Sequence, residues 1–191
     1  MRLDIGTVNE LSRAFSAASY SRLSPLKYKS TPLGMGEGDT RFSSPLRTFL
    51  VLYAGKDLKT AIAETVIRDR FEGNNVRNMM LSEFVGWGVV SVSATVPLLL
   101  LDIRTIGCLK LGVSTDIKGA KAQAEAREFS QSLHDQSPVD GILYRSRLTG
   151  LDCIAVYNRA VGKLVPKKMR PLVGFSGLVP ALRALRVNLI K

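Results

Sequence analysis

The sequence has few of the residues that build metal sites and disulfide frameworks. It contains two cysteines and one histidine in 191 residues. Cys108 and Cys153 each lie among apolar neighbours, which predicts buried free thiols and no disulfide. Two cysteines and one histidine make no recognisable set of metal ligands. We therefore expect neither a metal site nor a disulfide-stabilised fold.

Long apolar runs are lacking as well. The most apolar stretch, residues 89–101, contains serine, threonine and proline and is too short to cross a bilayer. The first residues show no signal-peptide pattern. We expect a cytoplasmic protein that does not bind membranes.

Acidic residues are scarce relative to basic ones. The chain has 16 Asp and Glu against 27 Lys and Arg, a net charge of +11. Such a surface favours polyanions, which include nucleic acid, phosphorylated ligands and acidic proteins. The sequence has no zinc-finger spacing, no aromatic RNP motif and no basic heptads. A solvated basic surface is therefore favoured, and a nucleic-acid-binding module stays as an alternative.

The length and composition are those of a folded domain. Hydrophobic residues make up 46% of the chain and charged residues 23%. We expect a single domain over residues 1–191, with a core at about 24–160, an N-terminal helix at 3–18 and a C-terminal tail at 166–191. The end of the tail, from Pro180, has the pattern of an amphipathic helix with Leu182, Leu185 and Leu189 on one face. This helix could dock a partner or cover the core of the protein itself, and the second interpretation is favoured.

Strand and helix patterns alternate irregularly along the chain. Apolar runs predict strands at 49–54, 89–95, 98–103, 141–144 and 153–157. Helical spacing predicts helices at 58–71, where Asp57 is the N-cap and Gly73 follows the end, and at 117–133. Residues 24–45 are rich in Ser, Pro, Gly and Thr and predict a long loop. The absence of a regular βαβ repeat indicates an α+β fold.

Four polar residues lie at the borders of these apolar runs. Arg41 follows a glycine-bearing loop, where its planar guanidinium could hold a phosphate; a surface arginine near a turn is the simpler interpretation. Glu64 lies among small residues of a helix, where its carboxylate could reach a cleft or be solvated on the helix flank, and the pattern favours neither. Tyr53 at a strand end could stack on a ring, and Ser146 just after a strand could bind a ribose or phosphate. A core tyrosine and a turn serine are the commoner outcomes for these two residues.

The contexts of these four residues together resemble the RES domain, a family of toxins in bacterial toxin–antitoxin pairs. The most specific segments are LYA at 52–54 with AIAE at 61–64, and DGILYRS at 140–146 with IAVY at 154–157. The resemblance implies an ADP-ribosyltransferase-like fold, with a split, mainly antiparallel sheet, flanking helices and a cleft for NAD. It also implies that Glu64 and Arg41 are catalytic, that Arg41, Tyr53 and Ser146 bind NAD, and that no metal takes part.

The resemblance implies a function as well. Members of the family degrade NAD and are neutralised by a helix-turn-helix antitoxin, so a cognate antitoxin is the expected partner, in a homo-oligomer or a toxin–antitoxin hetero-oligomer. We expect cleavage of the nicotinamide–ribose bond of NAD, with water or phosphate as the acceptor. A protein ADP-ribosyltransferase that uses the same cleft is the alternative, because both reactions share the charged ribose and differ in the acceptor.

Overall fold

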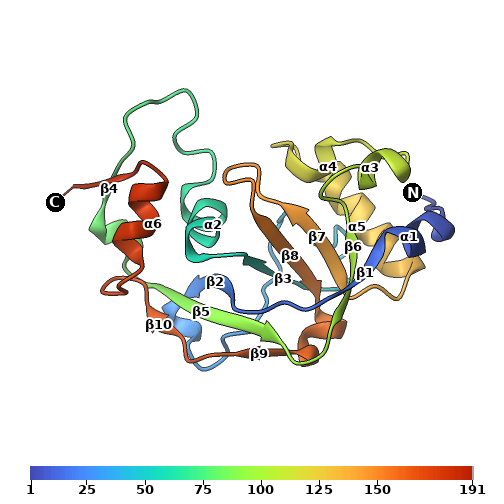
Figure 1. Ribbon diagram of the computed structural model, residues 1–191, viewed down its shortest axis with the longest axis horizontal. Coiled ribbons are helices and arrows are strands. Elements are labelled where there is room, and N and C mark those ends of the chain that lie inside the picture. Colours follow the sequence, from blue (N-terminus) through green and yellow to red (C-terminus); the bar gives the residue numbers. More distant parts are fainter. Residues whose placement is uncertain (191) are drawn as a thin grey trace.

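A curled sheet of mainly antiparallel strands is the centre of the fold (Figure 1). The computed structural model describes residues 1–190; Lys191, the last residue of the predicted tail, lies outside the described residues. The strands of this sheet follow the order β1-β6-β7-β8-β3-β2-β5-β10, and β9 also pairs with β5. Their bounds are β1 Ser12–Phe15, β2 Tyr20–Pro25, β3 Val51–Gly55, β5 Trp87–Ala94, β6 Leu98–Asp102, β7 Gly141–Arg145, β8 Asp152–Tyr157, β9 Leu164–Pro166 and β10 Arg170–Pro171. The pair β6–β7 is parallel, and the other pairs of this sheet are antiparallel.

Helices cover the sheet at both ends. In Figure 1, α1, α3, α4 and α5 gather at one end of the molecule, and α2, α6 and β4 lie at the other. The helices are α1 Ile5–Leu11, α2 Leu58–Ile62, α3 Gly107–Lys110, α4 Asp116–Gly119, α5 Ala124–Gln136 and α6 Leu178–Ala184, and a π-helical segment, Ala63–Ile67, directly follows α2. Three 3₁₀ turns lie at Leu26–Tyr28, Leu81–Phe84 and Asn158–Lys163. A small parallel sheet joins β4 Asn78–Met80 to β11 Asn188–Ile190.

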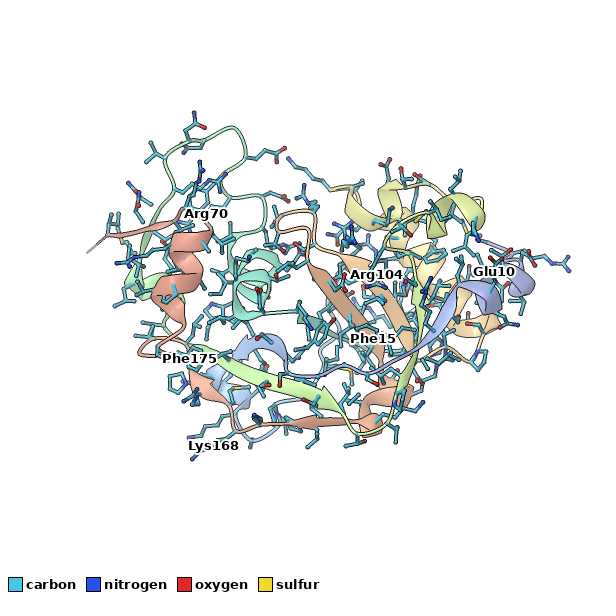
Figure 2. The ribbon with its side chains drawn as sticks, in the orientation of Figure 1. Glu10, Phe15, Arg70, Arg104, Lys168 and Phe175 are labelled. Carbon is cyan, nitrogen blue, oxygen red and sulfur yellow. The ribbon has the colours of Figure 1, made fainter. Side chains whose placement is uncertain are left out.

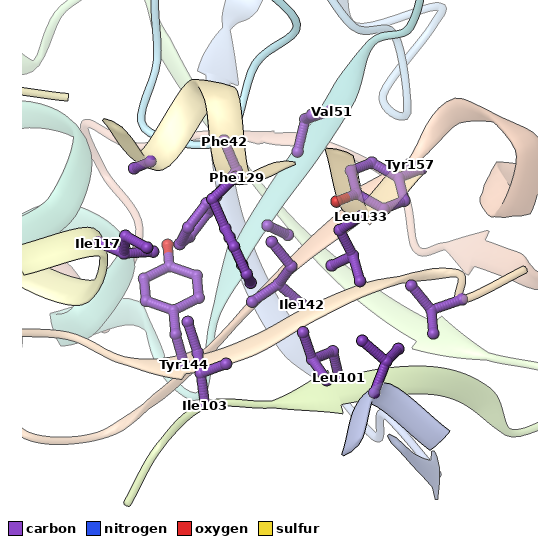
Figure 3. Packing of buried hydrophobic residues seen from close by; sticks show 14 of the residues in the cluster. Phe42, Val51, Leu101, Ile103, Ile117, Phe129, Leu133, Ile142, Tyr144 and Tyr157 are labelled. Atoms are coloured by element: carbon purple, nitrogen blue, oxygen red, sulfur yellow. The ribbon is translucent and has the colours of Figure 1, made fainter. Parts of the chain in front are cut away.

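The largest apolar cluster lies between α5 and the sheet. Figure 3 shows Phe129 and Leu133 of α5 beside Ile142 of β7 and Tyr157 of β8, and all four are fully buried. The apolar spacing that predicts this helix therefore marks its buried face. A separate cluster packs α2 and α6 against β4 and β5. The α+β prediction is confirmed.

A charged network fixes the ends of β6 and β8. Arg104, labelled in Figure 2, donates from Nε to Asp102 Oδ1 at 2.9 Å and from Nη1 to Asp152 Oδ2 at 2.7 Å. Asp102 closes β6 and Asp152 opens β8, so one guanidinium connects two strands that lie on either side of β7.

Four predicted helices differ from the structure. The helix expected at 3–18 ends at Leu11, because the backbone of Ser12 is extended and residues from Ser12 onward pair with β6. The helix expected at 58–71 also ends early. The helix expected from Pro180 is replaced by α6, which ends at Ala184, so Leu189 lies in β11 and not on the helix face. The helix expected at 117–133 is split into α4 and α5, and α5 continues to Gln136.

The regions expected outside the core contribute to the sheet. The strands β1, β9 and β10 lie outside the predicted core of residues 24–160 yet belong to the main sheet. The loop expected at 24–45 begins with the end of β2 and a 3₁₀ turn. Cys108 and Cys153 are both buried and free, as predicted. Within residues 1–190, none of the helices has the length and hydropathy needed to span a membrane.

Candidate active site

One cavity collects the residues that the sequence singled out. Arg41, Tyr53 and Glu64 line a cavity of about 380 Å³. Ser146 lies directly behind this lining, where its Oγ donates to Glu64 Oε1 at 2.6 Å. The fold thus brings together four residues from four separate segments of the chain. The rest of the lining consists of Arg22, Leu23, Thr40, Thr65, Arg68, Asp69, Trp87, Lys121, Gln123, Tyr144, Arg147 and Leu148.

Glu64 lies in the π-helical segment that continues α2. The helix begins at Asp57, whose Oδ1 accepts the backbone N–H of Thr60 at 2.8 Å, as expected for an N-cap. The predicted helix over 58–71 ends early, because the backbone N–H of Arg68 bonds to the carbonyl of Ala63 and Arg68 itself has a φ of 47°. Short π-helical turns inside α-helices are frequent at functional sites. The half-buried carboxylate of Glu64 faces the cavity.

Ser146 is held in a tight turn after β7. Its Oγ accepts the backbone N–H of Leu148 at 3.2 Å and of Thr149 at 3.1 Å, and it gives its own proton to Glu64. Ser146 is 2% exposed. The hydroxyl therefore fixes one oxygen of the Glu64 carboxylate, whereas a direct contact of Ser146 with a ligand stays a prediction.

Tyr53 fixes the turn that carries Arg41. Its hydroxyl accepts the backbone N–H of Phe42 at 2.8 Å and lies 2.9 Å from Thr40 Oγ1. Burial raises the pKa of Tyr53 to about 12, so the phenol stays neutral. Tyr53 is the middle residue of β3 and does not end it, contrary to the prediction. The phenol holds the residues on both sides of Arg41.

The guanidinium of Arg41 lies in the cavity without a counter-ion. Its Nη1 donates to the carbonyl oxygen of Ala120 at 2.9 Å, and no carboxylate within residues 1–190 forms an ion pair with it. Burial lowers the pKa of Arg41, and the nearby Tyr144 and Glu64 oppose that shift. A half-buried cation with free donors is suited to bind an anion.

Arg22 is a second such cation, which the sequence analysis missed. It comes from β2, and its guanidinium donates to the carbonyl oxygens of Tyr53 at 3.3 Å and of Gly34 at 2.6 Å. Its buried Nε has no hydrogen-bond partner among the described residues, and burial lowers the pKa of Arg22 to about 10. Arg22 lines both the main cavity and a smaller one of about 170 Å³. Residues 20–23 do not alternate between apolar and polar side chains, so no local pattern marks Arg22 as a site residue.

Aromatic side chains and ion pairs complete the walls. Burial raises the pKa of Tyr144 well above its usual range, and Trp87 of β5 adds a second, half-buried ring to the lining. Asp69 pairs with Arg147, and beside the cavity Glu72 pairs with Lys121. Within residues 1–190, no three His, Cys, Asp or Glu side chains are grouped as metal ligands.

Comparisons with known proteins identify the same family as the sequence segments around the four candidate residues. The protein resembles the one named "Probable toxin y4kH" from Sinorhizobium fredii, with 40% identity over 87 residues that cover 44% of this chain and 68% of that protein. It is also similar to a chain in the crystal structure of the M. tuberculosis MbcT-MbcA toxin-antitoxin complex. That match has a TM-score of 0.67 and 12% identity, and it covers 87% of this chain and 90% of the other.

The structural match confirms the ADP-ribosyltransferase-like fold that the resemblance implied. The family model described as the RES domain matches residues 11–173. The chain belongs to the RES domain family.

Proposed function

We propose that the protein is the toxin of a toxin–antitoxin pair and that it degrades NAD by cleaving the bond between nicotinamide and ribose. Membership in the RES family and the toxin named among its relatives support the first part. One observation carries the second part: a carboxylate held by a buried serine hydroxyl lies in the same cavity as Arg22 and Arg41, which form no ion pair within residues 1–190.

The carboxylate of Glu64 suits the charge that develops when the bond breaks. The C–N bond electrons leave with the nicotinamide nitrogen, which becomes neutral, and positive charge builds on the ribose. A carboxylate that is already fixed near this sugar stabilises the charge without reorganising. Ser146 supplies the fixation, because its hydroxyl donates to Glu64 and is itself oriented by two backbone amides. Water, which loses a proton to solvent, or phosphate then bonds to the ribose carbon.

The remaining lining suits the other parts of NAD. Guanidinium groups bind phosphate oxygens through paired N–H donors, which gives Arg41 and Arg22 the role of holding the pyrophosphate. The rings of Tyr53, Tyr144 and Trp87 offer apolar faces for the nicotinamide or the adenine. The cavity volume of about 380 Å³ falls within the range of about 300–1,000 Å³ that is usual for small-molecule sites.

The proposed partner is a cognate antitoxin of the helix-turn-helix class. A cell that makes an NAD-degrading enzyme must restrain it, and the similar fold comes from a toxin–antitoxin complex. Expression of the chain alone should arrest growth, and co-expression of the gene for its antitoxin should restore it.

The central test is turnover of NAD by the purified protein and by Glu64→Gln. The variant keeps the shape of the side chain and removes its charge, so we expect turnover to fall by at least about a hundredfold. Binding of a non-cleavable NAD analogue should change much less, because the carboxylate acts mainly on the transition state. Glu128→Gln, at an exposed position of α5, is the matched control.

The products identify the acceptor. Free ADP-ribose indicates hydrolysis, a phosphorylated ADP-ribose that forms only with phosphate indicates phosphorolysis, and modified protein indicates ADP-ribosyl transfer. Normal turnover in a folded Glu64→Gln protein would remove Glu64 from the mechanism, and no turnover by the wild type would reject the proposed reaction.

A further inference from the structure

Two side-chain bridges connect the helical segment of Glu64 with the turn of Ser146. The first is the hydrogen bond between Ser146 and Glu64 in the candidate site. The second joins Thr60 Oγ1 to Thr149 Oγ1 at 3.0 Å. Thr60 precedes Glu64 by four residues, so the two side chains lie on one face of the helical segment. Thr149 follows Ser146 by three residues in the same turn, so the two bridges run side by side.

Thr60 is fixed independently of the second bridge. It is fully buried, and its backbone N–H donates to the N-cap carboxylate of Asp57 at 2.8 Å. Its methyl group packs closely on β3, since a Cβ added at Gly55 would lie 2.9 Å from Thr60 Cγ2. Thr60 therefore gives the turn a rigid point of attachment at the start of the helix.

Thr149 connects Thr60 to Ser146 through hydrogen bonds within the turn. Its backbone N–H donates to Ser146 Oγ at 3.1 Å, and the N–H of Gly150 donates to the carbonyl oxygen of Ser146 at 2.8 Å. Gly150 has a φ of 70°, a conformation that glycine adopts readily and that closes the turn. A shift of Thr149 would consequently move the hydroxyl of Ser146.

We propose that Thr60 and Thr149 are positioning residues whose hydroxyl bridge sets the distance between Ser146 and Glu64. Neither threonine lines the cavity, so neither touches a ligand there. The bridge is needed because Glu64 lies in a π-helical segment, beyond the regular turn of α2, and the fixed contact at Thr60 keeps that irregular segment in register with the Ser146 turn. The expected effect on catalysis rests on the proposed NAD cleavage, whereas the effect on the distance between Ser146 and Glu64 does not.

The test compares Thr149→Val, which keeps the shape and removes the hydroxyl, with Thr149→Ser, which keeps the hydroxyl. We expect kcat for NAD to fall about ten- to a hundredfold in Thr149→Val, since small displacements of reacting groups have effects of this order. KM should stay within about twofold, because the arginines of the cavity are unchanged. Thr149→Ser should retain wild-type kcat, and Thr115→Val, at an exposed threonine, is the control.

Crystal structures of the same variants separate this proposal from the proposed function. In Thr149→Val the 2.6 Å contact between Ser146 and Glu64 should be lost, and in Thr149→Ser it should persist. If the wild type does not turn over NAD, the proposed reaction fails and these structures alone decide the positioning role. If Thr149→Val does not fold, Thr60→Ser and Thr149→Ala are used instead. The contact between Ser146 and Glu64 should persist in Thr60→Ser and be lost in Thr149→Ala. An intact contact in the valine or alanine variant overturns the proposal, and wild-type kcat despite a lost contact overturns its catalytic part.

Discussion

Arg22 and Arg41 line the same cavity, and neither forms an ion pair in the described part of the chain. Arg41 uses one nitrogen on the carbonyl of Ala120, and Arg22 uses two nitrogens on backbone carbonyls and leaves its buried Nε unpaired. Burying a charge without a partner destabilises a protein. An anionic ligand would remove that cost at both residues, which supports the proposal that this part of the cavity holds the pyrophosphate of NAD.

We predict that Arg41→Ala and Arg41→Lys both weaken binding of a non-cleavable NAD analogue. Lysine carries the same charge but cannot reproduce the planar pair of donors that phosphate oxygens accept. The loss should be about tenfold or more for each variant, as for other charge-assisted contacts. Calorimetric titration measures it, with Arg183→Ala at an exposed position of α6 as the control. Equal affinity of wild type and Arg41→Ala would reject the role.

Tyr53→Phe should act through Arg41. The variant leaves the backbone N–H of Phe42 without its acceptor, and Phe42 is fully buried. We expect a loss of about 1–3 kcal/mol in the free energy of unfolding, the cost of one unpaired buried group. Affinity for the NAD analogue should fall as well, because the turn that carries Arg41 is no longer held.

Urea unfolding and titration check the Tyr53 prediction, and Tyr28→Phe, at an exposed tyrosine, serves as the control. A variant that loses stability but binds the analogue normally would show that the phenol stabilises the turn without positioning Arg41.

At the scale of elements, the sequence predicted the strands and the helix around the four candidate residues. The apolar runs at β3, β7 and β8 and the cap at Asp57 are local signals, so the strands and the helix start were found within a few residues. The four candidate residues were singled out because each lies in or next to one of these runs, although Tyr53 is in the middle of β3 and not at its end. Their meeting in one cavity is a long-range property that came from the family resemblance and not from any local pattern.

The elements that were missed depend on contacts distant in sequence. β2 ends in Pro25, at the start of a stretch rich in turn residues, and the sequence predicted a loop from residue 24 onward. Pairing with β5 nevertheless makes residues 20–25 a strand and places Arg22 opposite Val90. Such pairing overrides local propensity. The π-helical segment has no signature in a 3.6-residue pattern, and its end at Arg68 depends on a residue with positive φ that the sequence does not mark.

The segment after this helix is held across the site by ion pairs. Asp69 pairs with Arg147 of the β7–β8 turn, and Glu72 pairs with Lys121 between α4 and α5. In Figure 1 the segment and the α4 region lie on either side of the β7–β8 turn. Both members of the Glu72–Lys121 pair are more than half exposed, at 57% and 58%. Exposed pairs contribute little stability and are screened by salt.

We predict that charge reversal at Lys121 or Glu72 raises KM for NAD several-fold and that the exchanged pair, Glu72→Lys with Lys121→Glu, recovers part of the loss. Each single variant places like charges at this contact, which drives the segment away from the cavity wall, whereas the double variant restores attraction. Steady-state kinetics at low and high salt measure the effect. Additive losses in the double variant would show that the pair does not act on the site.

At the scale of the whole molecule, the C-terminal tail belongs to the core. Leu182 is 1% exposed and Leu185 packs against the same cluster, so these two leucines do not serve as anchors for a partner. The favoured interpretation of the tail, that it covers the protein's own core, is confirmed for them. Leu189 is 36% exposed and pairs β11 with β4. The amphipathic pattern alone could not separate the two interpretations, because both need the same apolar face.

The buried thiols and phenols make the folded molecule sensitive to alkaline pH. Burial, and then the nearby charge of Glu64, raise the pKa of Cys153 to about 12, and burial raises that of Tyr53 to about 12. In the unfolded chain these groups ionise near pH 9 and 10. A raised pKa in the fold means that the unfolded state loses its protons first, so the stabilisation is complete below pH 9 and is lost as the pH rises toward 12.

We predict that the free energy of unfolding falls steadily above pH 9, by up to about 1.4 kcal/mol per pH unit for each such group. Urea unfolding between pH 7 and 11 measures the slope. Cys153→Ala removes one of the shifted groups, so its stability should decline less steeply between pH 9 and 10 than that of the wild type, whatever its stability at pH 7. Thr115→Val, at an exposed residue without a titratable side chain, should leave the slope unchanged. Parallel slopes for wild type and Cys153→Ala would mean that the thiol ionises as readily inside the fold as outside it, and that water reaches β8 where the structure has it buried.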